Sequence, residues 1–364
     1  MGAVRTVAVF GAYGHTGRFV VAELLDRGFV PVLSGRDAGK LAEFAASRPE
    51  LSDLEVRPAT VDDPASLDRA LAGVAAVINC AGPFASTAAP VIEAALRARI
   101  PYVDVAAEIE ANVDTFALFA EPAHAAGTVV IPAMAFFGGL GDLLVTAAMG
   151  DWTSADEVHV AYGLSSWHPT AGTRTAGAVS RQRRDGRHVR FTRGRLEYGD
   201  AAPSTTQKWA FPEPLGVSPV IGDFTMADVV TVPSHLDVPE VRTYMAVAAA
   251  ADLASSDTPA PAAVDERGRS AQTFLVDVVV RSGDEERRAV ARGQDIYAVS
   301  APLAVEAVAR VLSGRTRTVG RTGTDAAGQA AGATGAVGVA SAGAVFDAAD
   351  FLRSLSAHLS VELP

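Results

Sequence analysis

The sequence predicts an α/β protein whose N-terminal part is a doubly wound parallel sheet, with an inserted α+β domain on an antiparallel sheet. Strand-like and helical segments alternate over about the first 130 residues, and a glycine-rich turn follows the first strand. Beyond residue 150, apolar and polar residues alternate instead. Because 364 residues exceed one ordinary core, we expect two domains. They are 1–134 plus 296–364, which form the parallel-sheet domain, and 135–295, which forms the α+β substrate and dimerisation domain.

The first domain follows from the alternation of strands and helices. Its expected strands lie at residues 6–10, 31–34, 54–61, 74–80, 102–105 and 128–131. Its expected helices lie at residues 16–27, 40–46, 66–72, 88–99 and 111–126. Strands separated by helices of this length are joined by crossovers, so the sheet they form is parallel.

The second domain is predicted from half-buried strands and a hairpin. The expected strands lie at residues 157–164, 229–232, 243–248, 273–281 and 287–292. Helices at 302–312 and 347–355 are expected to return to the first domain. The Gly-, Ala- and Thr-rich stretch 322–338 between them is expected to be dispensable.

Bulk properties exclude several classes of protein. The net charge of −11 argues against nucleic acid as a partner. Cys80 is the only cysteine, and the chain begins without a visible signal peptide, so we expect a reducing, cytoplasmic setting. The apolar stretch 127–150 is interrupted by Pro132 and Asp142, which predicts strand, loop and buried helix and argues against membrane contact.

The segment Gly11-Ala12-Tyr13-Gly14-His15-Thr16-Gly17 lies between the first expected strand and helix. Gly11 permits a tight turn, Gly14 lets backbone N–H groups reach a diphosphate, and Gly17 allows close packing of helix and strand. The helix N-terminus adds partial positive charge. This context predicts a dinucleotide-binding Rossmann domain whose loop includes Tyr13, His15 and Thr16; the alternative is a structural glycine turn.

The second strand ends in Ser34-Gly35-Arg36-Asp37, where the adenosine ribose is expected. An acidic residue there binds the 2′-OH of NAD, whereas an arginine accommodates the 2′-phosphate of NADP. Arg36 follows Gly17 by nineteen positions, and Lys40 adds a second positive charge one turn later. We therefore expect NADP(H); an Asp37 that faces the ribose is the alternative.

The following strand ends supply the remaining cofactor candidates. Asp62 follows the third strand, near the expected adenine. Five residues follow the fourth strand, beside the expected ribose and nicotinamide: Cys80, Ala81, Gly82, Pro83 and Phe84. We interpret Cys80 as a small buried residue rather than a nucleophile, because no neighbour in the sequence would lower its pKa.

Together, residues 11–17, Leu33-Ser34-Gly35-Arg36-Asp37, residues 77–84 and Tyr102-Val103-Asp104 resemble the NADP-binding domain of saccharopine dehydrogenase-like proteins. Further segments resemble a bacterial branch that includes the trans-acting enoyl reductases. These segments are Ala161-Tyr162-Gly163, residues 169–173, Asp295-Ile296-Tyr297 and residues 346–352. The resemblance implies a Rossmann domain with an inserted α+β domain and NADP(H)-linked reduction.

A reductase needs a proton donor near the hydride acceptor. No tyrosine has a lysine four residues later, which excludes short-chain reductase chemistry, and the scattered histidines indicate no metal site. The catalytic candidates are Asp104, Glu108, Tyr162, His168, Arg174 and Lys208. Each has an alternative interpretation: a helix cap for the two acids, a loop position for His168, and a solvated charge for Lys208. Positioning without a strong acid also remains open.

An arginine-rich run lies in the second domain: Arg181, Arg183, Arg184, Arg187, Arg190, Arg193 and Arg195. It is either a solvated hairpin around Asp185-Gly186 or an anion-recognition patch. The leading hypothesis is an NADPH-dependent reductase of a C=N or activated C=C bond in a small-molecule or carrier-linked substrate. The alternative is a non-catalytic NADP-binding sensor or assembly protein. We also expect a homodimer formed through the antiparallel strands 273–281 and 287–292.

Overall fold

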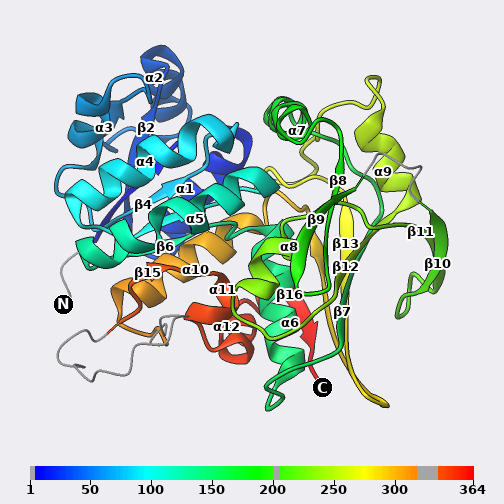
Figure 1. The fold of residues 1–364 in the computed structure, drawn as a ribbon. Helices are drawn as coiled ribbons and strands as arrows, with labels where there is room; N and C mark the ends of the chain where they lie inside the picture. Colours follow the sequence, from blue (N-terminus) through cyan, green and yellow to red (C-terminus); the bar gives the residue numbers. More distant parts are fainter. Residues whose placement is uncertain (1–4, 200–204, 318–334) are drawn as a thin grey trace, which may run out of the picture.

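The computed structural model describes residues 5–199, 205–317 and 335–364. Two sheets dominate it, and they are seen side by side in Figure 1. The first sheet has seven parallel strands in the order β15-β6-β5-β4-β1-β2-β3. Their bounds are β15 (Gly338–Val339), β6 (Val129–Ile131), β5 (Tyr102–Asp104), β4 (Ala76–Asn79), β1 (Thr6–Phe10), β2 (Val30–Gly35) and β3 (Val56–Pro58). The predicted doubly wound sheet is thus confirmed, with β15 as a seventh strand.

Helices cover both faces of this sheet. One face carries α1 (His15–Asp26), α2 (Ala38–Ala46) and α10 (Ser300–Leu312), and the other carries α3 (Pro64–Leu71), α4 (Phe84–Ala98) and α5 (Ile109–Ala126). Strands β1 and β4 are mostly apolar because they lie in the middle of the sheet and are buried on both faces. Alternate residues of β1 therefore enter two different cores: Val7 packs with α1, and Ala8 with α3 and α4.

The second sheet is mixed rather than purely antiparallel. Its strand path is β10-β11-β12-β7-β13-β14-β16, and β12 runs parallel to β7. The strands are β7 (Glu157–Leu164), β8 (His188–Thr192), β9 (Arg195–Gly199), β10 (Thr206–Ala210), β11 (Val217–Gly222), β12 (Val241–Ala246), β13 (Thr273–Ser282), β14 (Glu285–Gln294) and β16 (Leu359–Glu362). The hairpin β8–β9 attaches to β12.

The remaining helices are α6 (Gly141–Met149), α7 (Ala171–Arg183), α8 (Asp228–Thr231), α9 (Val247–Ala254), α11 (Ala342–Val345) and α12 (Ala348–Ser354). The strand expected at residues 229–232 is wrong, because α8 occupies this segment. Its valines are buried on a helical turn, and a short apolar run cannot separate that from a buried strand. Within residues 5–199, 205–317 and 335–364, no helix is long and apolar enough to cross a membrane.

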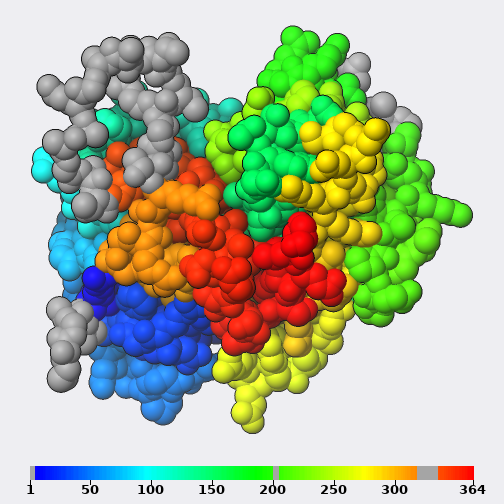
Figure 2. All heavy atoms as spheres, turned by 90° about the horizontal axis from the view of Figure 1, so that it is seen from below, coloured from blue at the N-terminus to red at the C-terminus, as the bar shows by residue number. Residues whose placement is uncertain are grey.

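The C-terminal segment is shared between the two sheets. Helix α10 packs on α1, and Figure 2 shows the orange-to-red C-terminal residues beside the blue N-terminal ones. However, β16 pairs with β14 in the second sheet, although the segment 296–364 was expected to lie in the first domain. Gly338 begins β15, so the end of the stretch 322–338 is an ordered strand. Residues 322–334 of that stretch lie outside the described residues.

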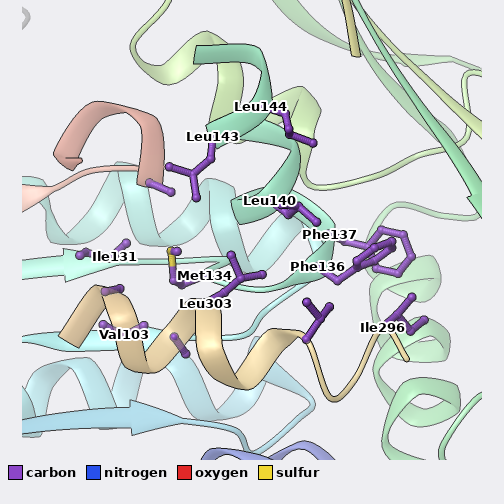
Figure 3. Close-up of a cluster of buried hydrophobic side chains, with 14 of the residues drawn as sticks. Val103, Ile131, Met134, Phe136, Phe137, Leu140, Leu143, Leu144, Ile296 and Leu303 are labelled. Atoms are coloured by element: carbon purple, nitrogen blue, oxygen red, sulfur yellow. The ribbon is translucent and has the colours of Figure 1, made fainter. Parts of the chain in front are cut away.

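One continuous core joins the two halves. The turn at Phe136–Leu140, together with Met134 and α6, fills the space between the first sheet and the second, as Figure 3 shows. Leu303 of α10 points into the same cluster and is 0% exposed. Because side chains from both sheets contribute to one packed cluster, the loops at the carboxyl ends of the first sheet are held in place by the second.

Candidate functional site

The register of the parallel strands aligns their carboxyl ends. Ser34 of β2 and Asn79 of β4 both pair with Phe10 of β1, and Asp104 of β5 pairs with Asn79. These four residues therefore form one row across the sheet. The loops that follow them meet at one edge, where open parallel sheets hold nucleotides.

The glycine loop is packed so tightly that larger residues do not fit. A Cβ on Gly17 would lie 2.2 Å from the carbonyl oxygen of Gly11. Gly11 itself has φ +88°, and a Cβ there would meet the backbone of Ala81 at 2.9 Å. The N–H groups of Gly11 and Ala12 donate to the carbonyl of Ser34. The strand–glycine–helix geometry inferred from the sequence is therefore present.

Helix α1 begins directly after this loop, at His15, and Thr16 lies in its first turn. Its first turn holds no acidic residue, and its N-cap, Gly14, offers no side-chain bond, so the first N–H groups remain available for an anion. Among the described residues, the Ser34 hydroxyl and the His15 Nε2 atom are buried without a hydrogen-bond partner. A glycine cradle beside unpartnered polar atoms and a helix N-terminus fits a bound dinucleotide.

Arg36 lies at the expected adenosine end. Its side chain is exposed and makes no ion pair or hydrogen bond within the described ranges. Asp37, in contrast, caps α2 by accepting from the Lys40 backbone N–H at 3.0 Å, and its carboxylate is 3.9 Å from Lys40 Nζ. Because Asp37 is used as a cap, Arg36 stays the predicted ligand for this end.

A pocket of about 380 Å³ adjoins the carboxyl end of β2, which Arg36 follows. It is lined by Tyr13, Arg18, Lys40, Glu43, Phe44 and Ser47. The Tyr13 ring lies close to Gly35, where a Cβ would be 2.9 Å from a ring carbon. Asp62 is exposed after β3, while its neighbour Asp63 caps α3. The pocket is thus bordered by two cations, one carboxylate and two aromatic rings.

The loop after β4 includes Cys80, Ala81, Gly82 and Pro83 and ends at Phe84, the first residue of α4. Burial, together with the charge of Asp104, raises the pKa of the Cys80 thiol. A thiol with a raised pKa is a poor nucleophile. Cys80 therefore serves packing at this edge.

Asp104 and Glu108 are committed to the backbone around the site. The Asp104 carboxylate accepts from the N–H groups of Ala106 and Ala133 and from the Tyr102 hydroxyl, and burial raises its pKa to about 6. Glu108 accepts from the N–H groups of Phe84 and Ala85 at 2.7 and 3.1 Å, and burial raises its pKa. Glu108 thus caps α4 across the loop, and both carboxylates support the structure of the site.

Two further candidates lie away from this edge. Tyr162 is 0% exposed, and its hydroxyl donates to the Asp228 carboxylate at 2.8 Å while its ring packs on Phe136 and Phe137. Tyr162 is thus a core residue, and its burial raises the pKa of the phenol. Lys208 is exposed on β10, at the far end of the second sheet from the cofactor loops in Figure 1.

Residues 167–174, which we call the arm, approach the site from the second domain. Trp167 stacks on Phe137 with ring centroids 5.0 Å apart, and its backbone N–H donates to the Asp252 carboxylate. Arg174 donates to the Thr258 carbonyl. A Cβ at Gly82 would lie 3.8 Å from the Ala176 side chain, so α7, the helix that the arm leads into, lies beside the loop after β4. His168 is half-buried in the same arm.

Tyr297 also lies at this edge, and the candidates inferred from the sequence do not include it. Its hydroxyl contacts Thr173 Oγ1 at 3.0 Å and Trp167 Nε1 at 3.3 Å, and its ring lies edge-on to His15 with centroids 5.1 Å apart. It therefore contacts both the glycine loop and the arm. The sequence signal for it is Asp295-Ile296-Tyr297 after a long strand, and this signal does not indicate where the Tyr297 side chain points.

The arginine-rich run is mostly paired with acids. Arg183, the last residue of α7, lies 2.7 Å from the Asp114 carboxylate of α5. Arg184, the next residue, lies 3.6 Å from the Glu110 carboxylate of the same helix. Three others, Arg190, Arg193 and Arg195, surround Glu197. The turn of the hairpin lies at Arg193-Gly194, whereas Asp185-Gly186 joins α7 to β8, so its expected position is wrong. The pairing favours a structural role over an anion patch.

Within the described ranges, no group of His, Cys, Asp and Glu could hold a metal ion. A surface cavity of about 970 Å³ lies between α5, α6 and the C-terminal helices. None of the cofactor or arm residues lines it, so we place the site at the carboxyl edge of the first sheet on geometric grounds.

Comparisons with known proteins agree with this geometry. Residues 7–131 match the family described as saccharopine dehydrogenase NADP binding domain. The chain is 30% identical over 145 residues to an Arabidopsis thaliana protein named probable mitochondrial saccharopine dehydrogenase-like oxidoreductase. It is 31% identical over 117 residues to a Bos taurus saccharopine dehydrogenase-like oxidoreductase. These matches cover 36% and 28% of this chain, but only 32% and 27% of the relatives' own lengths.

A solved structure covers the remainder. Apo saccharopine dehydrogenase (L-Glu forming) from Saccharomyces cerevisiae superposes with a TM-score of 0.63 over 99% of this chain and 100% of its own, at 10% identity. At that identity the likeness concerns the fold alone. Residues 7–131 are therefore similar to the saccharopine dehydrogenase NADP binding domain, and this similarity supports NADP(H) as the cofactor.

Proposed function

We propose that this chain is an NADP(H)-dependent oxidoreductase that reduces a C=N or activated C=C bond of a small substrate, anionic or carrier-linked. The observation that carries the proposal is Tyr297, whose hydroxyl contacts Thr173 of the arm while its ring lies against His15 of the glycine loop, with helix α7 beside the loop after β4. This contact supports a reaction chamber between the two domains.

NADPH supplies a hydride when it is bound, and the chain's own residues bind, orient and exclude water. The N-terminus of α1 and the glycine loop would hold the diphosphate, and Arg36 the 2′-phosphate. Trp167 and the start of α7 would cover the reacting end. Because Asp104 and Glu108 are bonded to backbone N–H groups, positioning carries more of the catalysis than a strong acid does.

His168 and Arg174 remain as groups that touch the substrate. Helix α7 contains Arg174 and Arg181 and no acidic residue. Only one hydrogen bond, to the Thr258 carbonyl, occupies the Arg174 guanidinium within the described part of the chain. Its free N–H groups and the positive helix end support an anionic substrate.

The test combines NADPH binding with turnover. NADPH oxidation is followed at 340 nm (roughly the reduced nicotinamide absorbance) with 2-oxo acid–amine mixtures and with enoyl thioesters. His168→Ala or Arg174→Ala should leave the NADPH Kd within about threefold and lower turnover by roughly 10²-fold. Lys208→Ala, at the far sheet edge, is the matched control and should change neither. NADPH binding without turnover on any substrate would favour the sensor or assembly protein instead.

A further inference from the structure

The segment that carries Tyr297 is fixed by buried hydrogen bonds. Asp295 is 0% exposed, and its carboxylate accepts from the N–H groups of Ser270, Tyr297 and Ala298 at 2.6, 2.9 and 3.0 Å. Its φ of +60° is rare for a residue with a side chain. A strained turn held by three charge-assisted bonds fixes the backbone from which the Tyr297 ring projects.

One oxygen atom of Tyr297 contacts four groups of the arm. The N–H groups of Trp167 Nε1 and Thr170 each lie 3.3 Å from it. Thr173 Oγ1 lies at 3.0 Å and the His168 carbonyl at 3.3 Å. A phenol has one proton to donate and two lone pairs that accept. The two N–H groups fill the lone pairs, and the proton goes to one of the two oxygens, so the hydroxyl is fully used by the arm.

The ring of Tyr297 contacts the other side of the site. It lies edge-on to His15, the first residue of α1, where a diphosphate would bind. His15 is enclosed between Tyr297 and Phe19, with centroids 5.1 and 5.4 Å away. Burial lowers the pKa of His15, while Asp295 opposes this effect. An anion at this helix end would restrain His15 and favour its charged form.

We propose that Tyr297 is a positioning residue that couples NADP(H) binding at the glycine loop to the order of the arm. The inference rests on the proposed function, because it takes the glycine loop as the cofactor site and the arm as the substrate side. Restraint of His15 restrains the ring packed on it, and the hydroxyl transmits this to Trp167, Thr170 and Thr173. The arm is therefore ordered over the substrate side when NADP(H) is bound.

Hydrogen–deuterium exchange with and without NADPH tests the coupling. In the unmodified protein, NADPH should slow exchange in the peptide that spans residues 165–176. Tyr297→Phe keeps the ring on His15 but removes the hydroxyl and its hydrogen bonds, so the apo arm should exchange at least about fivefold faster, which is the effect of a single lost bond. NADPH should then no longer slow it, while the NADPH Kd stays within about threefold.

Tyr244→Phe is the matched control, since it removes a hydroxyl bonded to His159 on the second sheet, away from the arm. It should leave arm exchange and its NADPH response unchanged. If Tyr297→Phe fails to fold, Thr173→Val serves in its place. It keeps Tyr297 but removes one of the hydroxyl's partners, so NADPH should slow arm exchange by an intermediate amount. NADPH binding that leaves arm exchange unaltered, or an undiminished response in Tyr297→Phe, would overturn the coupling alone. A protein that does not bind NADPH would overturn the proposed function as well.

Discussion

Replacing Arg36 by alanine separates the two nicotinamide cofactors. The Arg36 side chain is exposed and has no partner within the described residues, so the fold should lose less than about 0.5 kcal/mol. NADPH should lose hydrogen bonds from a guanidinium to its 2′-phosphate, each charge-assisted bond contributing roughly 1.5–3 kcal/mol. At 1.4 kcal/mol per factor of ten, the NADPH Kd should rise about 10- to 150-fold. NADH lacks the phosphate, and its Kd should change by less than about twofold.

The assay is a calorimetric or fluorescence titration of both cofactors at one fixed salt concentration, because exposed charges are screened. Arg48→Ala is the matched control: it removes the same charge from the same domain, and Arg48 pairs only with Glu50, at 3.9 Å, among the described residues. Its effect on NADPH measures the contribution of net charge alone. Equal losses for NADPH and NADH in Arg36→Ala, or a loss no larger than that of Arg48→Ala, would refute the assignment of Arg36.

Three other predictions follow from the packing. Gly17→Ala places a Cβ 2.2 Å from the Gly11 carbonyl oxygen, so it should abolish NADPH binding in a titration. It should also lower Tm, because overpacking costs about 1–3 kcal/mol of stability. Unchanged binding would contradict the tight packing of the glycine loop. Burial raises the pKa of Asp228 to about 7, so the folded state retains a proton that the unfolded state releases, and stability should fall as pH rises from about 4 to about 7. Asp228→Asn should flatten this part of a Tm–pH profile and raise Tm at pH 8; a profile as steep as that of the unmodified protein would contradict the argument. Light scattering should give twice the 37.5 kDa chain mass, because a homodimer is expected, and a monomer at micromolar concentration would count against it.

The homodimer prediction through strands β13 and β14 concerns their exposed face or the free part of the β14 edge. Strand β13 lies between β7 and β14, and β16 pairs with residues 290–293 of β14. On the described strand path, β10 forms one end of the sheet, and most of its residues are exposed. Substitution of an outward residue of β10 by proline should weaken the dimer if this edge is the contact, as measured by sedimentation.

The glycine loop and its neighbours could be predicted from the sequence because their signals are local. Gly11, Gly14 and Gly17 allow backbone segments only a few residues apart to pack closely. The period of the apolar residues predicts the strand before these glycines and the helix after them. Arg36 follows from counting along the same unit. These features depend on short-range sterics, so neither the second domain nor its orientation was needed to infer them.

The catalytic side was decided by tertiary structure. Tyr162 and Asp104 have the chemistry of a donor, but the core buries the first, and three hydrogen bonds occupy the second. Tyr297 lies more than 280 positions from His15, and nothing in the local pattern indicates that they touch. β16 likewise joins β14 through pairing between distant segments. Local periodicity records which face of an element is buried but not what packs against that face, and the chemistry of a side chain depends on that neighbour.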